Sequence, residues 1–315
     1  MQTPFNSKYP IVEAIMNGGS SLPLALACHE AGIFPSLFPQ DRDPVTRKTN
    51  HDILEAEIKE FVKFTGSSNF LLGVNALRLD DPKVLRILKD YKITHIELIV
   101  EDMNRRLNST PILPWVAHIH KNYDRLVKEF LNFLQPTIIL QRIKEPTVNT
   151  YSFAFGAKGS ESAGVNSTEF TTSELFDRQQ KLTPNGIILP YGGIGTPTQV
   201  ADYVRRGAAG VVVGTLLAAS KESNLPLAIK QAMVKTKKED VIRLPDTGQN
   251  SLILGDRDAV INSKIDQDDW NREHSLKSGL TGNSDSGHMY IGSSIDYVKD
   301  ILSVKEIVDY LVSEL

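Results

Sequence analysis

Short apolar runs alternate with amphipathic segments along most of the chain. The apolar runs are rich in β-branched and aromatic residues, and eight of them are typical of strands: residues 9–15, 33–38, 69–75, 94–100, 113–120, 152–159, 186–193 and 209–216. Helical spacing is clearest in residues 22–32, 81–91, 122–135 and 196–208. This alternation predicts βαβ units and a parallel sheet.

Eight strands suit an α/β fold of the closed (β/α)8 TIM-barrel type, for which 315 residues are enough. A ninth run, "PTIILQRI" at 136–143, also has the pattern of a strand. It either replaces one of the eight or forms an excursion before residues 152–159. The helix over 196–208 has Thr196 as its predicted N-cap, Pro197 in its first turn and Gly207 as its stop.

The pattern changes after Ser220. Residues 225–244 are helical and charged, residues 245–288 are polar, and residues 294–315 return to helical spacing. We predict a barrel built from residues 1–220 and 286–315, with a small, mostly helical insertion after the last strand, residues 221–285. Because an insertion at this point emerges beside the mouth of the barrel, we expect it to form a lid or a substrate subdomain.

Charge and cysteine content narrow the class of protein. The chain has 35 basic and 38 acidic residues and no strongly basic stretch, which argues against a nucleic-acid partner. It has no apolar run of the ~20 residues that span a membrane, and its polar N-terminus lacks a signal-peptide core. We therefore expect a cytoplasmic protein with no membrane partner. Cys28 is the single cysteine and lies at helical spacing, which favours a buried core residue over a nucleophile.

Two glycine turns follow the last two predicted strands. Gly192 and Gly193 come directly after one strand and Gly214 after the next, with one helix between them. The loops after the last two strands of such barrels frequently bind phosphate, and glycine lets backbone N–H groups approach an anion. Thr215 adds a hydroxyl donor. The glycines could simply end their strands, but their paired arrangement favours a phosphate site.

Several motifs, in order along the chain, resemble one family. They are "YPIVEAIMNGGSSLPLALACHEAG" (9–32), "LLGVN" (71–75), "KGSESAG" (158–164), "YGGIGTPTQVADYVRRGAAGVVVGTLLAASKES" (191–223), "AIKQAMVKTKKEDVIRL" (228–244) and "GHMYIGSSIDYVKDILSVKEIVDYL" (287–311). Together they resemble the FMN-dependent nitronate monooxygenases, also called 2-nitropropane dioxygenases. That family includes FMN-type enoyl-acyl-carrier-protein reductases. The resemblance covers both ends of the chain and most of its middle.

The resemblance implies an FMN site and roles for individual residues. The backbone of Ala14, Ile15 and Met16 would lie along the flavin, and Asn75 would hydrogen-bond a flavin edge or the phosphate side. Lys158 would face the N1–C2=O end of the ring, where a cation stabilises the anionic reduced flavin. The phosphate would be held by Gly192, Gly193, Gly214 and Thr215, and the pocket would be closed by Gly292 and Ser293. Structural alternatives are packing for Met16, a strand-end cap for Asn75, a solvated loop for Lys158 and an ordinary turn for Gly292.

One position departs from the family pattern. The family's Gly-Gly-His stands here as Ala163-Gly164-Val165, and valine cannot act as the proton-abstracting base. Among other candidates, His120 is preferred as a catalytic residue because it lies near the end of a predicted strand, with His118 on the same face. The further candidates are Glu161 in the glycine-rich turn, the pair His95 and Glu97, and His288 in the closing segment.

The first functional hypothesis is an FMN-dependent oxidoreductase that oxidises a small organic substrate such as an alkyl nitronate, with O2 or another electron acceptor. One alternative is a flavin-dependent enoyl-thioester reductase or a flavoprotein of a polyketide or fatty-acid pathway. Another is a flavin-free barrel enzyme that binds a phosphorylated metabolite, and a further one is a flavoprotein that has lost efficient chemistry. The sequence suggests no metal site and leaves the oligomeric state open, a homodimer included.

Overall fold

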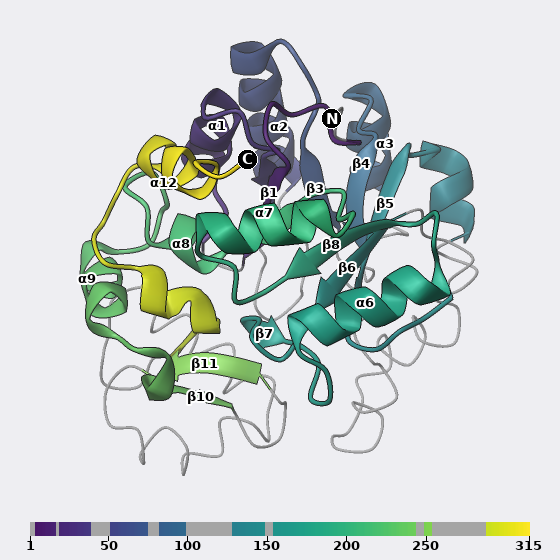
Figure 1. Cartoon of the computed structure of the whole chain (residues 1–315). Coiled ribbons are helices and arrows are strands. Elements are labelled where there is room, and N and C mark those ends of the chain that lie inside the picture. The colour runs from purple at the N-terminus through teal and green to yellow at the C-terminus, as the bar shows by residue number, and fades with distance from the viewer. Residues whose placement is uncertain are drawn as a thin grey trace, which may run out of the picture.

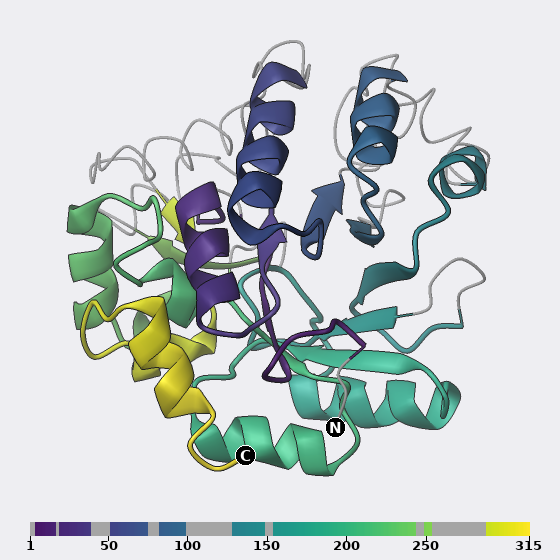
Figure 2. The same ribbon diagram turned by 90° about the horizontal axis from the view of Figure 1, so that it is seen from above.

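Eight parallel strands form a nearly closed barrel with helices around it (Figures 1 and 2). The computed structural model describes residues 4–16, 19–38, 51–74, 82–98, 128–148, 154–243, 249–253 and 288–315. The barrel strands are β1 (Ile11–Glu13), β2 (Ser36–Leu37), β3 (Leu71–Val74), β4 (His95–Leu98), β5 (Ile138–Ile143), β6 (Ala154–Lys158), β8 (Ile187–Tyr191) and β9 (Val211–Val213). They pair in the order β1-β9-β8-β6-β5-β4-β3-β2. A parallel bridge between Val12 and Phe34 brings the two ends of this order together.

The identity of one barrel strand was open from the sequence. Strand β5 pairs with β4 on one side and with β6 on the other, with Leu140 opposite Glu97 and Ala154. Residues 136–143 therefore supply a barrel strand rather than an excursion. The eight strands of the sheet do not include the predicted strand 113–120, which lies outside the described residues.

Helices cover the outside of the barrel, as the view from above shows (Figure 2). They are α1 (Leu22–Glu30), α2 (His51–Thr65), α3 (Pro82–Asp90), residues 128–134, α6 (Thr172–Leu182), α7 (Pro197–Arg205), the short α8 (Thr215–Ala218) and α12 (Val304–Leu311). The predicted boundaries of α7 are confirmed. Thr196 caps its first turn through the backbone N–H of Gln199, and Gly207 follows its end at φ +91°. That left-handed conformation favours glycine, which is why the helix stops there.

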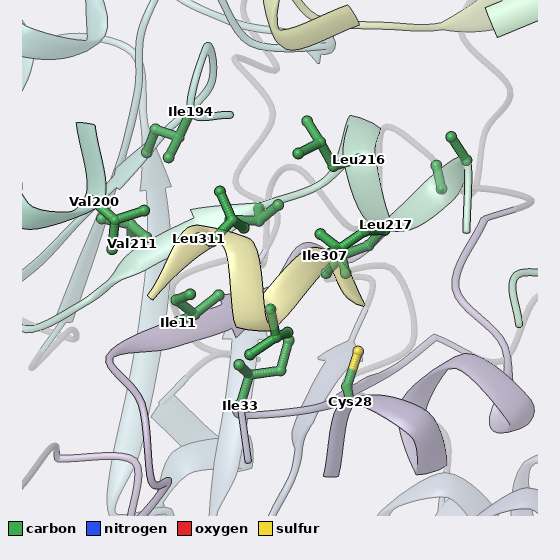
Figure 3. Packing of buried hydrophobic residues seen from close by; sticks show 14 of the residues in the cluster. Ile11, Cys28, Ile33, Ile194, Val200, Val211, Leu216, Leu217, Ile307 and Leu311 are labelled. Atoms are coloured by element: carbon green, nitrogen blue, oxygen red, sulfur yellow. The ribbon is translucent and has the colours of Figure 1, made fainter. Parts of the chain in front are cut away.

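Two apolar layers hold this fold together. Inside the barrel, side chains such as Val12, Leu71, Leu140, Leu189 and Val212 form one buried cluster. Outside it, the C-terminal helix α12 packs against α1, α7 and α8 in a cluster that also includes Ile11 of β1 and Val211 of β9 (Figure 3). Figure 3 shows Ile307 and Leu311 on α12, and it places Cys28 on α1 at the edge of the same cluster. Cys28 is fully buried, so its prediction as a core residue is confirmed.

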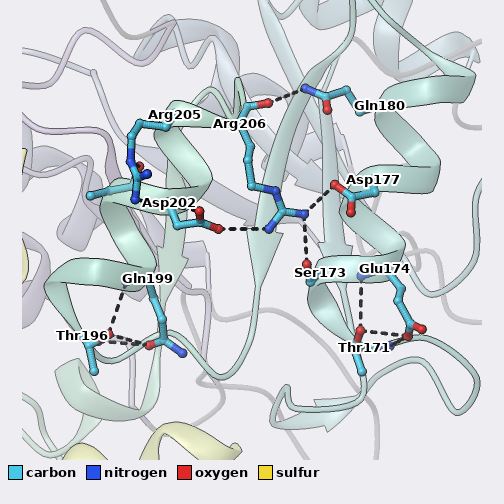
Figure 4. Close-up of polar contacts among 11 residues, drawn as sticks. Thr171, Ser173, Glu174, Asp177, Gln180, Thr196, Gln199, Asp202, Arg205 and Arg206 are labelled. Carbon is cyan, nitrogen blue, oxygen red and sulfur yellow. Dashed lines mark hydrogen bonds and ion pairs between the residues drawn. The ribbon is translucent and has the colours of Figure 1, made fainter.

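An ion-pair cluster joins α6 to α7 on the outer surface (Figure 4). The guanidinium of Arg206 donates to Asp177 and Ser173 on α6 and to Asp202 on its own helix. The Gln180 side chain donates in turn to the backbone carbonyl of Arg206 at 2.8 Å. This cluster is partly exposed, so we expect it to add little to stability.

The late segment contributes a second, smaller sheet as well as a helix. Helix α9 (Leu227–Lys235) is followed by β10 (Val241–Arg243), β11 (Gln249–Ile253) and β12 (His288–Tyr290), which pair antiparallel. A two-residue strand, β7 (Gly164–Val165), pairs with β11 as well. The sequence patterns had suggested helix in this segment but not these strands. Among the described helices, none has the length and hydrophobicity needed to cross a membrane.

Glu13 is an acidic residue inside the outer apolar layer. It is fully buried on β1, and the N–H of Ser36 donates to its carboxylate at 2.8 Å. Burial raises the pKa of Glu13 from 4.5 to about 8. The folded protein therefore holds a proton on Glu13 across a pH range in which the unfolded chain has lost it.

This pKa predicts a pH dependence of stability. Between the unfolded pKa of 4.5 and the folded value of about 8, folding takes up one proton. The free energy of unfolding should thus fall as pH rises through this window, by at most about 1.4 kcal/mol per pH unit. Glu13→Gln should remove this slope, as measured by urea unfolding from pH 5 to pH 8. Glu169→Gln, at an exposed position, is the control. A wild-type curve parallel to that of Glu13→Gln would contradict the assignment.

Candidate active site at the barrel mouth

The two predicted glycine turns lie side by side at the carboxyl ends of the barrel strands. The turn Gly192-Gly193 follows β8, and Gly214 follows the neighbouring strand β9. The two glycines of the first turn have different surroundings. A Cβ on Gly192 would lie 2.1 Å from the Ser162 hydroxyl oxygen, so Gly192 is needed for packing whatever binds nearby. A Cβ on Gly193 would have more room, lying 3.0 Å from the Cβ of Glu161 and 3.2 Å from the Ser293 hydroxyl oxygen.

The C-terminal segment closes this region by direct hydrogen bonds. The N–H of Gly292 donates to the Thr215 hydroxyl at 3.2 Å, and the N–H of Ser293 donates to the carbonyl of Glu161 at 2.9 Å. The predicted group Gly193, Thr215, Gly292 and Ser293 is therefore brought together by three separate parts of the chain. Because Thr215 accepts from Gly292, its own O–H proton can be donated to a ligand.

The turn after β1 lies next to the second glycine. A Cβ on Gly214 would lie 3.2 Å from the Cβ of Ala14 and 3.5 Å from the sulfur of Met16. The turn is held by Ser20, whose hydroxyl accepts from the N–H of Met16 at 2.9 Å. Residues 14–16 therefore border the same mouth as the glycine turns.

Lys158 ends β6 at this mouth and is 8 % exposed. This burial contradicts the alternative of a solvated loop lysine. A Cβ on Gly164 would lie 3.7 Å from the Lys158 ammonium nitrogen and 3.9 Å from the ring of Tyr290 on β12. The lysine thus lies beside the turn that carries position 165 and beside the small sheet. Tyr290 belongs to the closing segment, two residues after the candidate His288.

The residues present fit a phosphate group. The absence of a side chain at Gly193 and Gly214 leaves their backbone open where a Cβ would crowd Glu161 and Ala14, and the Ser293 hydroxyl lies close to Gly193. The Thr215 hydroxyl directly follows Gly214 and is held by Gly292. The buried cation of Lys158 lies at the same end of the barrel. Anions are stabilised by such donors when water is largely excluded. No group of three or more histidine, cysteine, aspartate or glutamate side chains suited to a metal ion occurs among the described residues.

The other acidic and histidine candidates have different surroundings. The Glu161 carboxylate accepts from the N–H of Thr172 at 2.8 Å and so caps the start of α6. His95 opens β4 at the opposite end of the barrel and packs against Phe5 and Phe34. Burial lowers its pKa to about 4. A neutral histidine at the amino ends of the strands cannot serve a site at their carboxyl ends.

Several predicted residues lie outside what the structure describes. They are Asn75, His118 and His120, so their roles remain predictions. Val165 is described in its backbone, where β7 pairs it with Gln249 of β11. The position that carries the base in the resembling family is thus part of a strand that anchors the small sheet.

A buried polar cluster at the mouth was missed by the sequence analysis, except for Glu97. Arg142 on β5 donates through Nε to Glu97, and the Tyr191 hydroxyl donates to the same Glu97 oxygen at 3.0 Å. Burial alone would lower the pKa of Arg142, but the neighbouring Glu97 carboxylate outweighs it and the pKa of Arg142 is raised, so the guanidinium stays charged. Arg142 could have been recognised only once residues 136–143 had been assigned to the barrel.

The fold is that of a (β/α)8 barrel, and both glycine turns lie at the carboxyl ends of its strands. The profile of the nitronate monooxygenase family matches residues 154–314, just over half of the chain. The protein therefore belongs to the nitronate monooxygenase family, a family of oxidoreductases. A search of curated proteins finds no match to the sequence.

Solved structures share the fold across nearly the whole chain. FabK from Thermotoga maritima has a TM-score of 0.73 at 19 % identity, covering 98 % of this chain and 93 % of that one. Nitroalkane oxidase from Streptomyces ansochromogenes has a TM-score of 0.70 at 18 % identity, covering 98 % and 96 %. The enoyl reductase domain of MlnA, from the macrolactin biosynthesis cluster of Bacillus amyloliquefaciens, has a TM-score of 0.65 at 12 % identity, covering 98 % and 94 %. At these identities the similarity establishes the fold.

Proposed function

We propose that this protein is an FMN-dependent oxidoreductase that oxidises a small organic substrate, such as an alkyl nitronate, with O2 as the acceptor. The observation that carries the proposal is the meeting of three separate features at one mouth. The glycine turns with Thr215 and Ser293 suit a phosphate, the turn 14–16 borders Gly214, and the buried Lys158 ends a neighbouring strand. Membership of the nitronate monooxygenase family adds the expectation of flavin chemistry.

In this proposal each feature has one task. Gly193, Gly214, Thr215 and Ser293 bind the phosphate, and the backbone of residues 14–16 lies along the ring. A bound flavin supplies the capacity to accept electrons from the substrate. Lys158 places a positive charge where the reduced ring is negative, and the surrounding apolar barrel excludes water.

The first experiment is to measure whether the purified protein is yellow and how much FMN heat releases from it. One FMN per chain is the expected result, because the paired turns form one phosphate site. A colourless protein that also fails to bind added FMN would reject the proposal. Protection by a phosphorylated metabolite would then favour the flavin-free barrel enzyme.

Lys158 gives a second prediction. Replacing it with methionine should make the flavin reduction potential more negative, because the reduced anion loses its counter-charge. We expect a change of roughly 30 mV, equivalent to about 1.4 kcal/mol for a two-electron couple. The potential is measured by reduction against a reference dye.

Lys230 supplies the matched control for this measurement. It is another buried lysine, and its ammonium donates to the carbonyl of Ser223 at 2.7 Å on the outside of the barrel. Lys230→Met should leave the potential unchanged. Equal potentials for Lys158→Met and the wild type would place Lys158 away from the ring.

A second candidate function is the reduction of an enoyl thioester. The observation that bears on it is Val165, because oxidation of a neutral nitroalkane needs a base at this position, whereas reduction of an enoyl thioester removes no proton from its substrate. Enoyl reductase is also the activity named for the MlnA domain that shares the fold. Reoxidation of the reduced flavin by an enoyl thioester would select this function if nitronates and nitroalkanes also fail to reduce the oxidised flavin.

We also propose that residues 221–285 form one wall of the substrate pocket. The described part of this segment reaches the mouth through β11, which pairs with β7, and through Arg243 of β10. The Arg243 guanidinium donates to the carbonyls of Ser160 and Ser167 on either side of the β7 turn. The turn that follows Lys158 is therefore bound to the insertion on two sides.

A further inference from the structure

The buried polar cluster of Glu97, Arg142 and Tyr191, named here the mouth cluster, lies at the carboxyl ends of three barrel strands. Glu97 and Arg142 are the second-last residues of β4 and β5, and Tyr191 is the last residue of β8. The Glu97 side chain is fully buried and that of Arg142 is 16 % exposed. Gly156, opposite Arg142 on β6, leaves room for the Tyr191 ring, since a Cβ there would lie 2.8 Å from it.

The mouth cluster is joined to both turns that border the proposed flavin site. On one side, the Arg142 guanidinium donates to the carbonyl of Ile15 at 3.0 Å. Ile15 is the middle residue of the turn 14–16, which contacts Gly214. On the other side, Tyr191 directly precedes Gly192 and Gly193. Hydrogen bonds therefore connect the carbonyl of Ile15 to the hydroxyl of Tyr191 through Arg142 and Glu97, and the chain itself connects Tyr191 to the turn after β8.

The cluster is built in a way that favours a fixed geometry. A guanidinium is a rigid planar donor, and it here serves a carboxylate and a backbone carbonyl at once. The Tyr191 hydroxyl donates to the Glu97 oxygen that Arg142 also contacts. Burying an ion pair is costly, and apolar side chains of similar volume would often stabilise a core as well or better. The cluster therefore calls for a reason other than stability.

We propose that the mouth cluster is a positioning device that holds the turn 14–16 and the turn 192–193 at the separation that FMN requires. This role rests on the proposed function, because it presumes that both turns border the flavin. Arg142 acts through the carbonyl of Ile15, and Tyr191 acts through the glycines that follow it. Neither side chain is assigned a contact with substrate. The cluster thus adds three positioning residues to those expected from the family resemblance.

The test compares three variants by FMN affinity, visible flavin spectrum and melting temperature without flavin. Tyr191→Phe keeps the ring against Gly156 and removes one hydroxyl. The double variant Glu97→Gln with Arg142→Met removes both charges together, so that neither is left buried alone. Arg206→Met is the matched control, because Arg206 serves two carboxylates on the outer surface, between α6 and α7.

We expect the double variant to bind FMN about tenfold more weakly, since a hydrogen bond from a charged group is lost at the turn. Its visible flavin spectrum should also shift. Tyr191→Phe should weaken binding in the same direction. A fourth variant, Arg142→Lys with Glu97 retained, should bind FMN more tightly than the double variant, because it keeps a cation beside the carboxylate. Arg206→Met should bind FMN like the wild type.

The outcomes separate this proposal from the proposed function. If the wild-type protein binds no FMN, the proposed function is wrong and the role of the cluster falls with it. If the wild type binds FMN and a folded double variant binds it equally well with the same spectrum, only the positioning role is wrong. Should the double variant fail to fold, Tyr191→Phe decides, and wild-type affinity and spectrum in that variant would overturn the proposal.

Discussion

Preformed alkyl nitronates should reduce the flavin of this protein about 10²–10⁴-fold faster than the parent nitroalkanes at the same pH. A neutral nitroalkane must lose a carbon-bound proton, which requires a base, whereas a nitronate is already the anion. The family's histidine position is occupied by Val165, which has no proton to exchange. The measurement is single-turnover flavin reduction with each form of the substrate, so that reoxidation does not affect the rates.

Two replacements of Val165 test this prediction, and the pairing of β7 with β11 makes them suitable. The backbone of Val165 is fixed opposite Gln249 of β11, so a side-chain replacement leaves the strand pairing available. Val165→His should raise the rate with neutral nitroalkane and leave the nitronate rate near that of the wild type. Val165→Ala is the control for the loss of the branched side chain.

Two results would contradict the prediction in different ways. Equal rates with both forms would mean that another base acts, and His120 is then the first residue to replace. No reduction by either form would reject nitronate oxidation and favour an acyl thioester as the substrate. The second result would leave the flavin site and the family membership intact.

Gly193→Leu should weaken FMN binding by roughly 10²–10⁴-fold, because the added side chain would keep the phosphate from the charge-assisted hydrogen bonds of the proposed site. A Cβ at this position would lie 3.0 Å from the Cβ of Glu161 and 3.2 Å from the Ser293 hydroxyl oxygen, so a leucine would crowd the residues that border the proposed phosphate site. Binding is measured by quenching of FMN fluorescence on titration with the protein freed of its flavin.

Backbone strain needs its own control in this experiment. Gly193 has φ +74°, a left-handed conformation that leucine adopts only at a cost. Gly66 has a similar φ of +69°, and a Cβ there would meet no atom within 4 Å among the described residues. Gly66→Leu should therefore show the stability loss that comes from backbone strain alone and keep full FMN affinity. Retained FMN binding by Gly193→Leu would show that the phosphate lies elsewhere.

Much of the local structure could be predicted from the chain alone. Thr196, Pro197 and Gly207 marked the ends of α7 because caps and left-handed glycines depend on neighbouring residues only. The glycine turns after β8 and β9 were visible for the same reason. The capping box of Thr171 and Glu174 is a comparable local signal for the start of α6, a helix that apolar periodicity alone does not predict.

The sequence by itself thus determined the alternation of strands and helices, the helix ends, and the glycine positions at the mouth, all of which follow from local backbone and side-chain preferences. Only the tertiary structure decided that residues 138–143 rather than 113–120 lie between β4 and β6, because two apolar runs of equal character differ only in their distant partners. It alone brought Glu97, Arg142 and Tyr191 into one cluster and buried Glu13 beside Ser36. A buried charge is stable only when a partner from another strand meets it, and barrel closure rather than sequence spacing determines which strands meet.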